Sequence, residues 1–152
     1  MDFKGLEEKF KCLNNSKNSI QKIVSHESFV YIANGNKIGC YLIAQKSKAT
    51  EYQELFSKEI EFDIIDLSIN NNGTYLALYG SNEQGLNKLC VIPLFELNII
   101  LSSNIQINPL LVRVLEIDSN NMKDSKIMKV AWHPLSKEST ALLVLSSNNF
   151  LR

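Results

Sequence analysis

The two histidines, His26 and His133, are the candidates in this chain for an imidazole base or an imidazole ligand. His26 lies close to Ser25 and Ser28, the residue type of a nucleophile, but neighbours in sequence do not by themselves form a catalytic triad. His133 directly precedes Pro134, where we expect the ring to pack or bond locally in a turn. We therefore predict no catalytic histidine.

Two aspartates, Asp63 and Asp66, stand on either side of an apolar pair and are the candidates for paired-carboxylate catalysis. Such catalysis needs a substrate cleft that the sequence does not reveal, so we expect both side chains to be solvated or to cap turns. The glycines that could form a phosphate-binding loop all fall in expected hairpins or loops: Gly35, Gly39, Gly73, Gly80 and Gly85. We predict no cofactor.

The three cysteines, Cys12, Cys40 and Cys90, are odd in number, far apart and without a Cys-x-x-Cys pair. This pattern is typical of reduced structural thiols rather than of a disulfide framework or a zinc site. We predict no metal site.

The charge balance argues against a nucleic-acid partner, because 16 basic residues face 16 acidic ones. No apolar run approaches the roughly 20 residues of a membrane span, and the first residues lack the apolar core of a secretory signal. We infer a cytosolic or nuclear-side protein that neither binds nucleic acid directly nor inserts into a membrane.

The elements that must position these residues are strands. In the first unit, Asn34-Gly35-Asn36-Lys37 separates two apolar runs and predicts a hairpin, because asparagine and glycine tolerate the positive φ of such turns. Residues 45–50 are expected to be a polar loop. The expected strands are 20–24, 29–33, 38–44 and 51–56.

A second unit begins near Phe62 and repeats this plan, with a hairpin at Asn70-Asn71-Asn72-Gly73. Residues 95–110 form an apolar excursion with room for a helical turn; they either fold back on the sheet or dock a partner, and we favour folding back. The expected strands are 64–69, 74–79, 88–94 and 111–117.

A third unit begins with a strand at 127–132, where a period of two places Met128, Val130 and Trp132 on one face. Trp132 is read as packing between units rather than as a peptide-binding residue. Pro134 ends the strand. A continuous apolar run at 141–145 predicts a strand buried on both faces, and Phe150-Leu151 opens a third strand.

Three strand-rich units of similar plan predict an all-β fold: a partial, WD40-like β-propeller with about three N-terminal blades of four-stranded antiparallel sheets. The chain ends in mid-blade, so we expect it to be part of something longer and unstable alone. The expected divisions are 1–19, an N-terminal arm or short helix, and 20–152, the propeller part, with blade 1 at about 20–56, blade 2 at about 62–118 including an excursion at 95–110, and the start of blade 3 at 126–152.

The stretches 125–135, 141–145 and 148–152 resemble the third-blade signature of the nucleoporin 82/88 family. That signature is a hydrophobic strand entering an aromatic-His-Pro turn, then a Val/Leu-rich strand, then an Asn or acidic turn into an Ile/Leu-Arg strand. The Gly-His and Trp-Asp dipeptides of WD repeats are absent, which also favours this family. The residues that carry the resemblance are Val130, Trp132, His133, Pro134 and Leu135.

The resemblance implies a non-enzymatic scaffold on the cytoplasmic face of the nuclear pore complex, at the nuclear envelope. Its implied partners are other nucleoporins, namely the C-terminal domain of an FG nucleoporin and a tail helix of a second nucleoporin, in support of mRNA export. The gripping loops of the family lie in later blades, so the resemblance implies no binding residue in this chain. Two alternatives stay open: an unrelated WD40-like adaptor, and a propeller enzyme with its catalytic residues further along.

Overall fold

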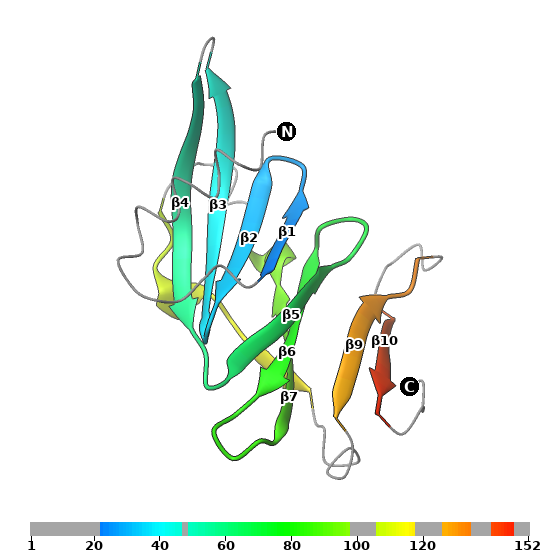
Figure 1. Ribbon diagram of the computed structural model, residues 1–152. Helices are drawn as coiled ribbons and strands as arrows, with labels where there is room; N and C mark the ends of the chain where they lie inside the picture. The colour runs from blue at the N-terminus through cyan, green and yellow to red at the C-terminus, as the bar shows by residue number, and fades with distance from the viewer. Residues whose placement is uncertain (1–21, 47–48, 98–105, 118–125, 135–140, 148–152) are drawn as a thin grey trace.

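The computed structural model describes residues 22–46, 49–97, 106–117, 126–134 and 141–147. Strands dominate these residues, and two short 3-10 helices join them (Figure 1). The elements are β1 (Lys22–His26), β2 (Phe29–Asn34), β3 (Lys37–Lys46), β4 (Ala49–Glu59), β5 (Asp63–Ile69), β6 (Tyr75–Ser81), β7 (Asn87–Pro93), η1 (Leu94–Glu96), η2 (Pro109–Leu111), β8 (Leu115–Ile117), β9 (Ile127–Trp132) and β10 (Leu142–Ser146).

The strands form three antiparallel sheets in which each strand pairs with the next one along the chain. The first has the order β1-β2-β3-β4, the second β5-β6-β7-β8, and the third consists of β9 and β10. We call these sheets blade 1, blade 2 and blade 3. The expectation of an all-β, propeller-like fold built from four-stranded antiparallel sheets is confirmed.

The three sheets follow one another from left to right in Figure 1, and their first strands lie next to each other. β1 contacts β5, and β5 contacts β9, although these strands lie far apart in sequence. This common edge, formed by the first strand of each sheet, is the inner edge of the stack.

Two apolar layers fill the spaces between the blades. β6 serves both layers, because Leu76 and Leu78 pack toward blade 1 whereas Ala77 and Tyr79 pack toward blade 3. Each fully buried leucine contributes about 1.5–3 kcal/mol relative to an exposed one. A sheet covered on both faces needs an uninterrupted apolar run, which explains the composition of 75–79.

The excursion folds back onto the core at both of its described ends. Leu97 and Ile107 are 3% and 2% exposed and belong to the layer between blades 1 and 2. The amide of Ile107 also donates a hydrogen bond to the carbonyl of Leu55 on β4. The two ends of the excursion overlap with η1 and η2, in agreement with the expectation that it has room for a helical turn. Residues 98–105 lie outside the described part of the chain.

Two predicted element boundaries were wrong. The polar loop expected at 45–50 instead lies within a long hairpin, because β3 continues to Lys46 and pairs with β4 from Ala49. The last strand of blade 2 starts at Leu115 rather than at 111. Asn108 caps η2 by accepting a hydrogen bond from the amide of Leu110, so the backbone turns here instead of extending.

The predicted face of β9 was also wrong at one residue. Its pairing with β10 shifts between Leu145 and Ser146, and Met128 becomes the extra residue of a bulge. The bulge reverses the alternation, so Ile127 is buried beside Val130 whereas Met128 is 57% exposed. On β10, Leu145 is 41% exposed, so this strand is not buried on both faces as predicted.

A second irregularity lies at the start of blade 2. The pairing of β5 with β6 shifts between Ile64 and Asp66, which brings the backbone of β5 close to Gly80. A Cβ atom added at Gly80 would lie 1.8 Å from the carbonyl oxygen of Asp63. Only glycine fits at this position without a movement of the backbone.

Candidate functional site

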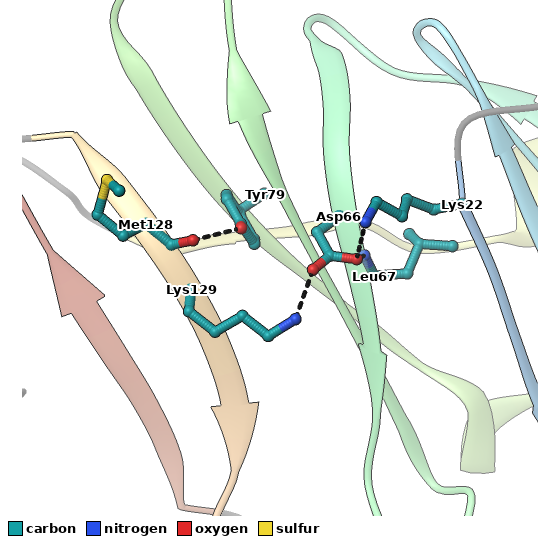
Figure 2. Close-up of polar contacts among 6 residues, drawn as sticks. All are labelled: Lys22, Asp66, Leu67, Tyr79, Met128 and Lys129. Carbon is teal, nitrogen blue, oxygen red and sulfur yellow. Dashed lines mark hydrogen bonds and ion pairs between the residues drawn. The ribbon is translucent and has the colours of Figure 1, made fainter.

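Asp66 lies on the inner edge, where the three blades meet, and its carboxylate joins all of them (Figure 2). The residue is 9% exposed. Its Oδ2 atom accepts a hydrogen bond of 2.8 Å from Nζ of Lys129 on β9, and its Oδ1 atom lies 3.7 Å from Nζ of Lys22 on β1. Oδ1 also accepts a hydrogen bond of 3.0 Å from the amide of Leu67. We call Lys22, Asp66 and Lys129 the inner charge cluster.

The inner charge cluster is organised to keep Asp66 ionised. Burial acts to raise the pKa of this carboxyl, but the hydrogen bonds from Lys129 and Leu67 and the charges of Lys129 and Lys22 outweigh it and lower the pKa. The pKa of Lys129 is raised by its hydrogen bond to Asp66 and by the charge of that carboxylate. A carboxyl with a lowered pKa and occupied oxygens is a poor proton donor at neutral pH, so the cluster suits attachment between blades rather than acid catalysis.

Neutral hydrogen bonds add to the attachment of blade 3 to blade 2. The hydroxyl of Tyr79 donates to the carbonyl of Met128 at 2.9 Å (Figure 2). The indole Nε1 of Trp132 donates to the carbonyl of Ser68 at 2.9 Å. Each of these two hydrogen bonds contributes about 0.5–1.5 kcal/mol, and together they help to position β9 against β5 and β6.

Those residues of the predicted signature that the structure describes lie at or beside the interface between blade 2 and blade 3. Val130 is 3% exposed, and Trp132 packs with its ring centroid 5.9 Å from that of Tyr75. The carbonyl of Pro134 accepts a hydrogen bond of 3.2 Å from the side chain of Asn71. Packing between blades is therefore the role of Trp132, as its apolar strand face indicated.

His133 directly follows β9, and its backbone amide donates a hydrogen bond to the carbonyl of Ala141, just before β10. Leu135, like residues 1–19 and the strand expected at Phe150-Leu151, lies outside the described residues.

His26 serves as a packing residue between blades 1 and 2. A Cβ atom added at Gly73 in the β5–β6 hairpin would lie 2.2 Å from Cδ2 of the His26 ring, so the ring fills the space that this glycine leaves. Nε2 of His26 lies 3.9 Å from a carboxylate oxygen of Glu27. Within the described residues no serine hydroxyl is hydrogen-bonded to this ring, so Ser25 and Ser28 do not complete a triad there.

With this geometry in view, the chain can be compared with known proteins. The sequence model of Nup88, described as a nuclear pore component, matches residues 13–152, which is most of the chain. The chain belongs to the Nup88 family of nuclear pore components. Over 164 residues it is also 26% identical to the nucleoporin nup82 of Schizosaccharomyces pombe, an alignment that covers 85% of this chain and 19% of that protein. The chain thus spans about a fifth of the length of this curated relative.

Membership of the Nup88 family confirms the resemblance drawn from 125–152. It leaves no support for the alternative of an unrelated WD40-like adaptor. The match begins at residue 13, well before the signature, so it also covers the residues that form blades 1 and 2.

The described cysteines of this Nup88 family member are buried and free. Burial raises the pKa of Cys40 to about 12, although a hydrogen bond from Tyr31 acts in the opposite direction. Burial, together with the charge of Glu116, raises the pKa of Cys90 to about 11. Both thiols are therefore neutral at pH 7, as expected of structural cysteines. Cys12 lies outside the described residues.

Among the described positions, no group of three or more His, Cys, Asp or Glu side chains is placed to hold a metal ion. No helix there is long and apolar enough to cross a membrane.

Sequence reasoning missed the inner charge cluster. Asp66 was expected to be solvated or to cap a turn, and it is instead buried between two lysines. A usable signal was present: each expected first strand, at 20–24, 64–69 and 127–132, has one charged residue among apolar ones, and a buried charge is normally paired. What the sequence did not reveal was that the three first strands lie side by side.

Proposed function

We propose that this chain is the N-terminal part of a propeller that acts as a structural scaffold on the cytoplasmic side of the nuclear pore complex. In this proposal it helps to anchor FG nucleoporins through the C-terminal domain of one of them and a tail helix of a second nucleoporin, and it supports mRNA export. Residues 20–152 form the blades, and residues 1–19 form an arm or short helix. The segment that attaches blade 3 to blade 2 consists of Val130, Trp132, His133, Pro134 and Leu135.

One observation carries the proposal: the polar side chains at the interfaces between the blades form hydrogen bonds from one blade to the next. The carboxylate of Asp66, the hydroxyl of Tyr79 and the indole of Trp132 all bond across an interface. A rigid stack of this kind presents loops at fixed positions, which is what a scaffold requires. The nuclear pore description of the family supports the location, and the nucleoporin identity of the fission yeast relative supports nucleoporin partners.

The proposal is tested with the full-length protein, fluorescently tagged in cells. We expect it at the cytoplasmic face of the pore, and we expect FG nucleoporins to purify with it. A tagged protein found elsewhere, or one that purifies without FG nucleoporins, would contradict the proposal.

The role of the signature is tested separately by Trp132→Ala. This change removes the indole hydrogen bond and part of the apolar layer, at a cost of about 2–4 kcal/mol. We expect weaker recovery of FG nucleoporins, because blade 3 then detaches more often. Met128→Ala on the same strand is the matched control, since this side chain is 57% exposed and only its backbone carbonyl is used. Equal recovery with both variants would show that the signature does not hold the scaffold together.

A further inference from the structure

A cavity of about 280 Å³ lies between the end of β4 and the outer strands of blade 2. Its inner part is apolar, because Ile60, Phe62 and Cys90 line it and are 5–8% exposed. Val114, just before β8, completes the apolar wall. The volume is at the small end for ligand pockets and suits one long side chain rather than a cofactor.

The charged residues around this cavity leave two carboxylates available. Lys88 pairs with Glu116, and Lys58 donates a hydrogen bond of 2.9 Å to the carbonyl of Pro109. Glu59 and Glu61 also line the cavity and are exposed. The charge of Glu61 helps to raise the pKa of Lys88, after the larger effect of the hydrogen bond from Lys88 to Glu116, but neither Glu59 nor Glu61 lies within ion-pair distance of another described residue. Two lysines and three glutamates give the lining a net charge of −1, with the excess on Glu59 and Glu61.

The cavity borders the outer edge of blade 2. β8 is the last strand of its sheet, and Leu115–Ile117 pair on one side with Leu89–Val91 of β7. Among the described strands none pairs with the other side of β8. Exposed apolar side chains lie in η2, which packs against β4, since Leu110 is 85% and Leu111 is 59% exposed.

From these observations we propose that the cavity receives an arginine side chain from an extended segment of a partner protein, whose backbone pairs with the free edge of β8. The aliphatic part of an arginine matches the apolar wall, and its guanidinium can bond the carboxylates of Glu59 and Glu61 at the mouth. Pairing with a free strand edge supplies backbone hydrogen bonds, while the cavity supplies selectivity. An acidic mouth disfavours phosphate-bearing partners such as RNA. This inference does not depend on which face of the pore the protein occupies.

The test uses the full-length protein and a fluorescein-labelled peptide of alternating valine and threonine with one central arginine. A matched peptide carries glutamine in place of the arginine. We expect the arginine peptide to bind more tightly by about 2- to 30-fold in fluorescence anisotropy, the range for two partly exposed charge pairs, and to lose this advantage in high salt. Equal binding of the two peptides by the wild-type protein would overturn the proposal.

Variants of the protein locate the contact. The double variant Glu59→Gln, Glu61→Gln is expected to bind the arginine peptide no better than the glutamine peptide. Glu83→Gln is the matched control, because Glu83 is also exposed but does not line the cavity. If the double variant retained the preference for arginine, the cavity would not be the site. Two N-methylated forms of the arginine peptide test the strand pairing: in each form the methyl groups block the amides that point to one of its two edges. If the peptide pairs with β8, one of the two forms must lose binding. Full binding of both forms would refute pairing with β8.

Discussion

Replacing Asp66 by asparagine should loosen the attachment of blade 3 to blade 2 while leaving the shape of the side chain unchanged. Asparagine still accepts the hydrogen bond from the amide of Leu67, but it loses the charge that Lys129 contacts at 2.8 Å and Lys22 at 3.7 Å. A hydrogen bond to a charged group contributes about 1.5–3 kcal/mol, and an exposed ion pair about 0.2–1 kcal/mol. The side chain of Lys129 is 61% exposed and regains water when the pair is lost, which offsets part of this sum. We expect a net cost of about 1–2 kcal/mol, drawn from these two ranges after that offset.

Hydrogen–deuterium exchange of the full-length protein measures this cost where it arises. At neutral pH, peptides covering β9 should exchange about 5- to 30-fold faster in Asp66→Asn than in the wild type, which is the factor that corresponds to 1–2 kcal/mol. Lys129→Met should have a similar effect, and the double variant should be little worse than either single one, because both changes break one contact. Lys22→Met is the control, and it should affect β1 more than β9.

The pH dependence gives the reasoning a further test. Because the folded pKa of Asp66 lies below its ordinary value of 3.8, its contribution is fully present above about pH 4 to 5 and is lost as the pH falls through the lowered pKa. The pKa of Lys129 is raised above 10.5, so its contribution is fully present below about pH 10.5 and is lost as the pH rises through that raised value. The wild type and Asp66→Asn should therefore differ most between about pH 5 and 10. Additive effects of Asp66→Asn and Lys129→Met, or a difference that persists unchanged at strongly acidic pH, would refute this account.

Two further predictions concern the packing of the blades. Gly80→Ala should destabilise the protein by about 3 kcal/mol or more, seen as a lower melting temperature or loss of soluble protein, because its Cβ would lie 1.8 Å from the carbonyl oxygen of Asp63; Gly85→Asn, at a site with nothing within 4 Å and a φ of 74° that asparagine tolerates, should change the melting temperature little. Cys40 and Cys90 should resist iodoacetamide at pH 7.5 and react only after unfolding, because burial keeps both pKa values near 11 or 12; peptide mass spectrometry measures this, and rapid labelling of the native protein would contradict the burial described here.

Strand positions could be predicted because their causes are local. The alternating or continuous apolar runs at 29–33 and 74–79 became β2 and β6, and the predicted hairpin between 33 and 38 formed with Gly35 at a φ of 60°. A turn residue and a period of two act over a few positions, so neither requires knowledge of distant segments.

The strand boundaries that were wrongly predicted depend on contacts between strands, which an apolar pattern in the sequence does not reveal. The hairpin of β3 and β4 continues into polar residues, where Gln45 pairs with Thr50, and within the same hairpin the hydroxyl of Tyr41 donates to the carboxylate of Glu54 across the strands. Cross-strand pairs of this kind stabilise a sheet without an apolar pattern. The same limit applied to the cavity beside β8, since its walls come from segments that lie about 30 to 50 residues apart in sequence.

The sequence alone determined the strand order, the repeated plan of the units and the family signature, because period, turn residues and motif spacing are properties of neighbouring residues. Tertiary structure alone decided which side chains meet. The bulge at Met128 turned this one residue away from the buried face of β9, and the alignment of β1, β5 and β9 placed Asp66 between Lys22 and Lys129. Contacts between strands 40 or more residues apart depend on how whole sheets stack, and that arrangement minimises buried charge and exposed apolar surface over the entire molecule rather than within any one segment.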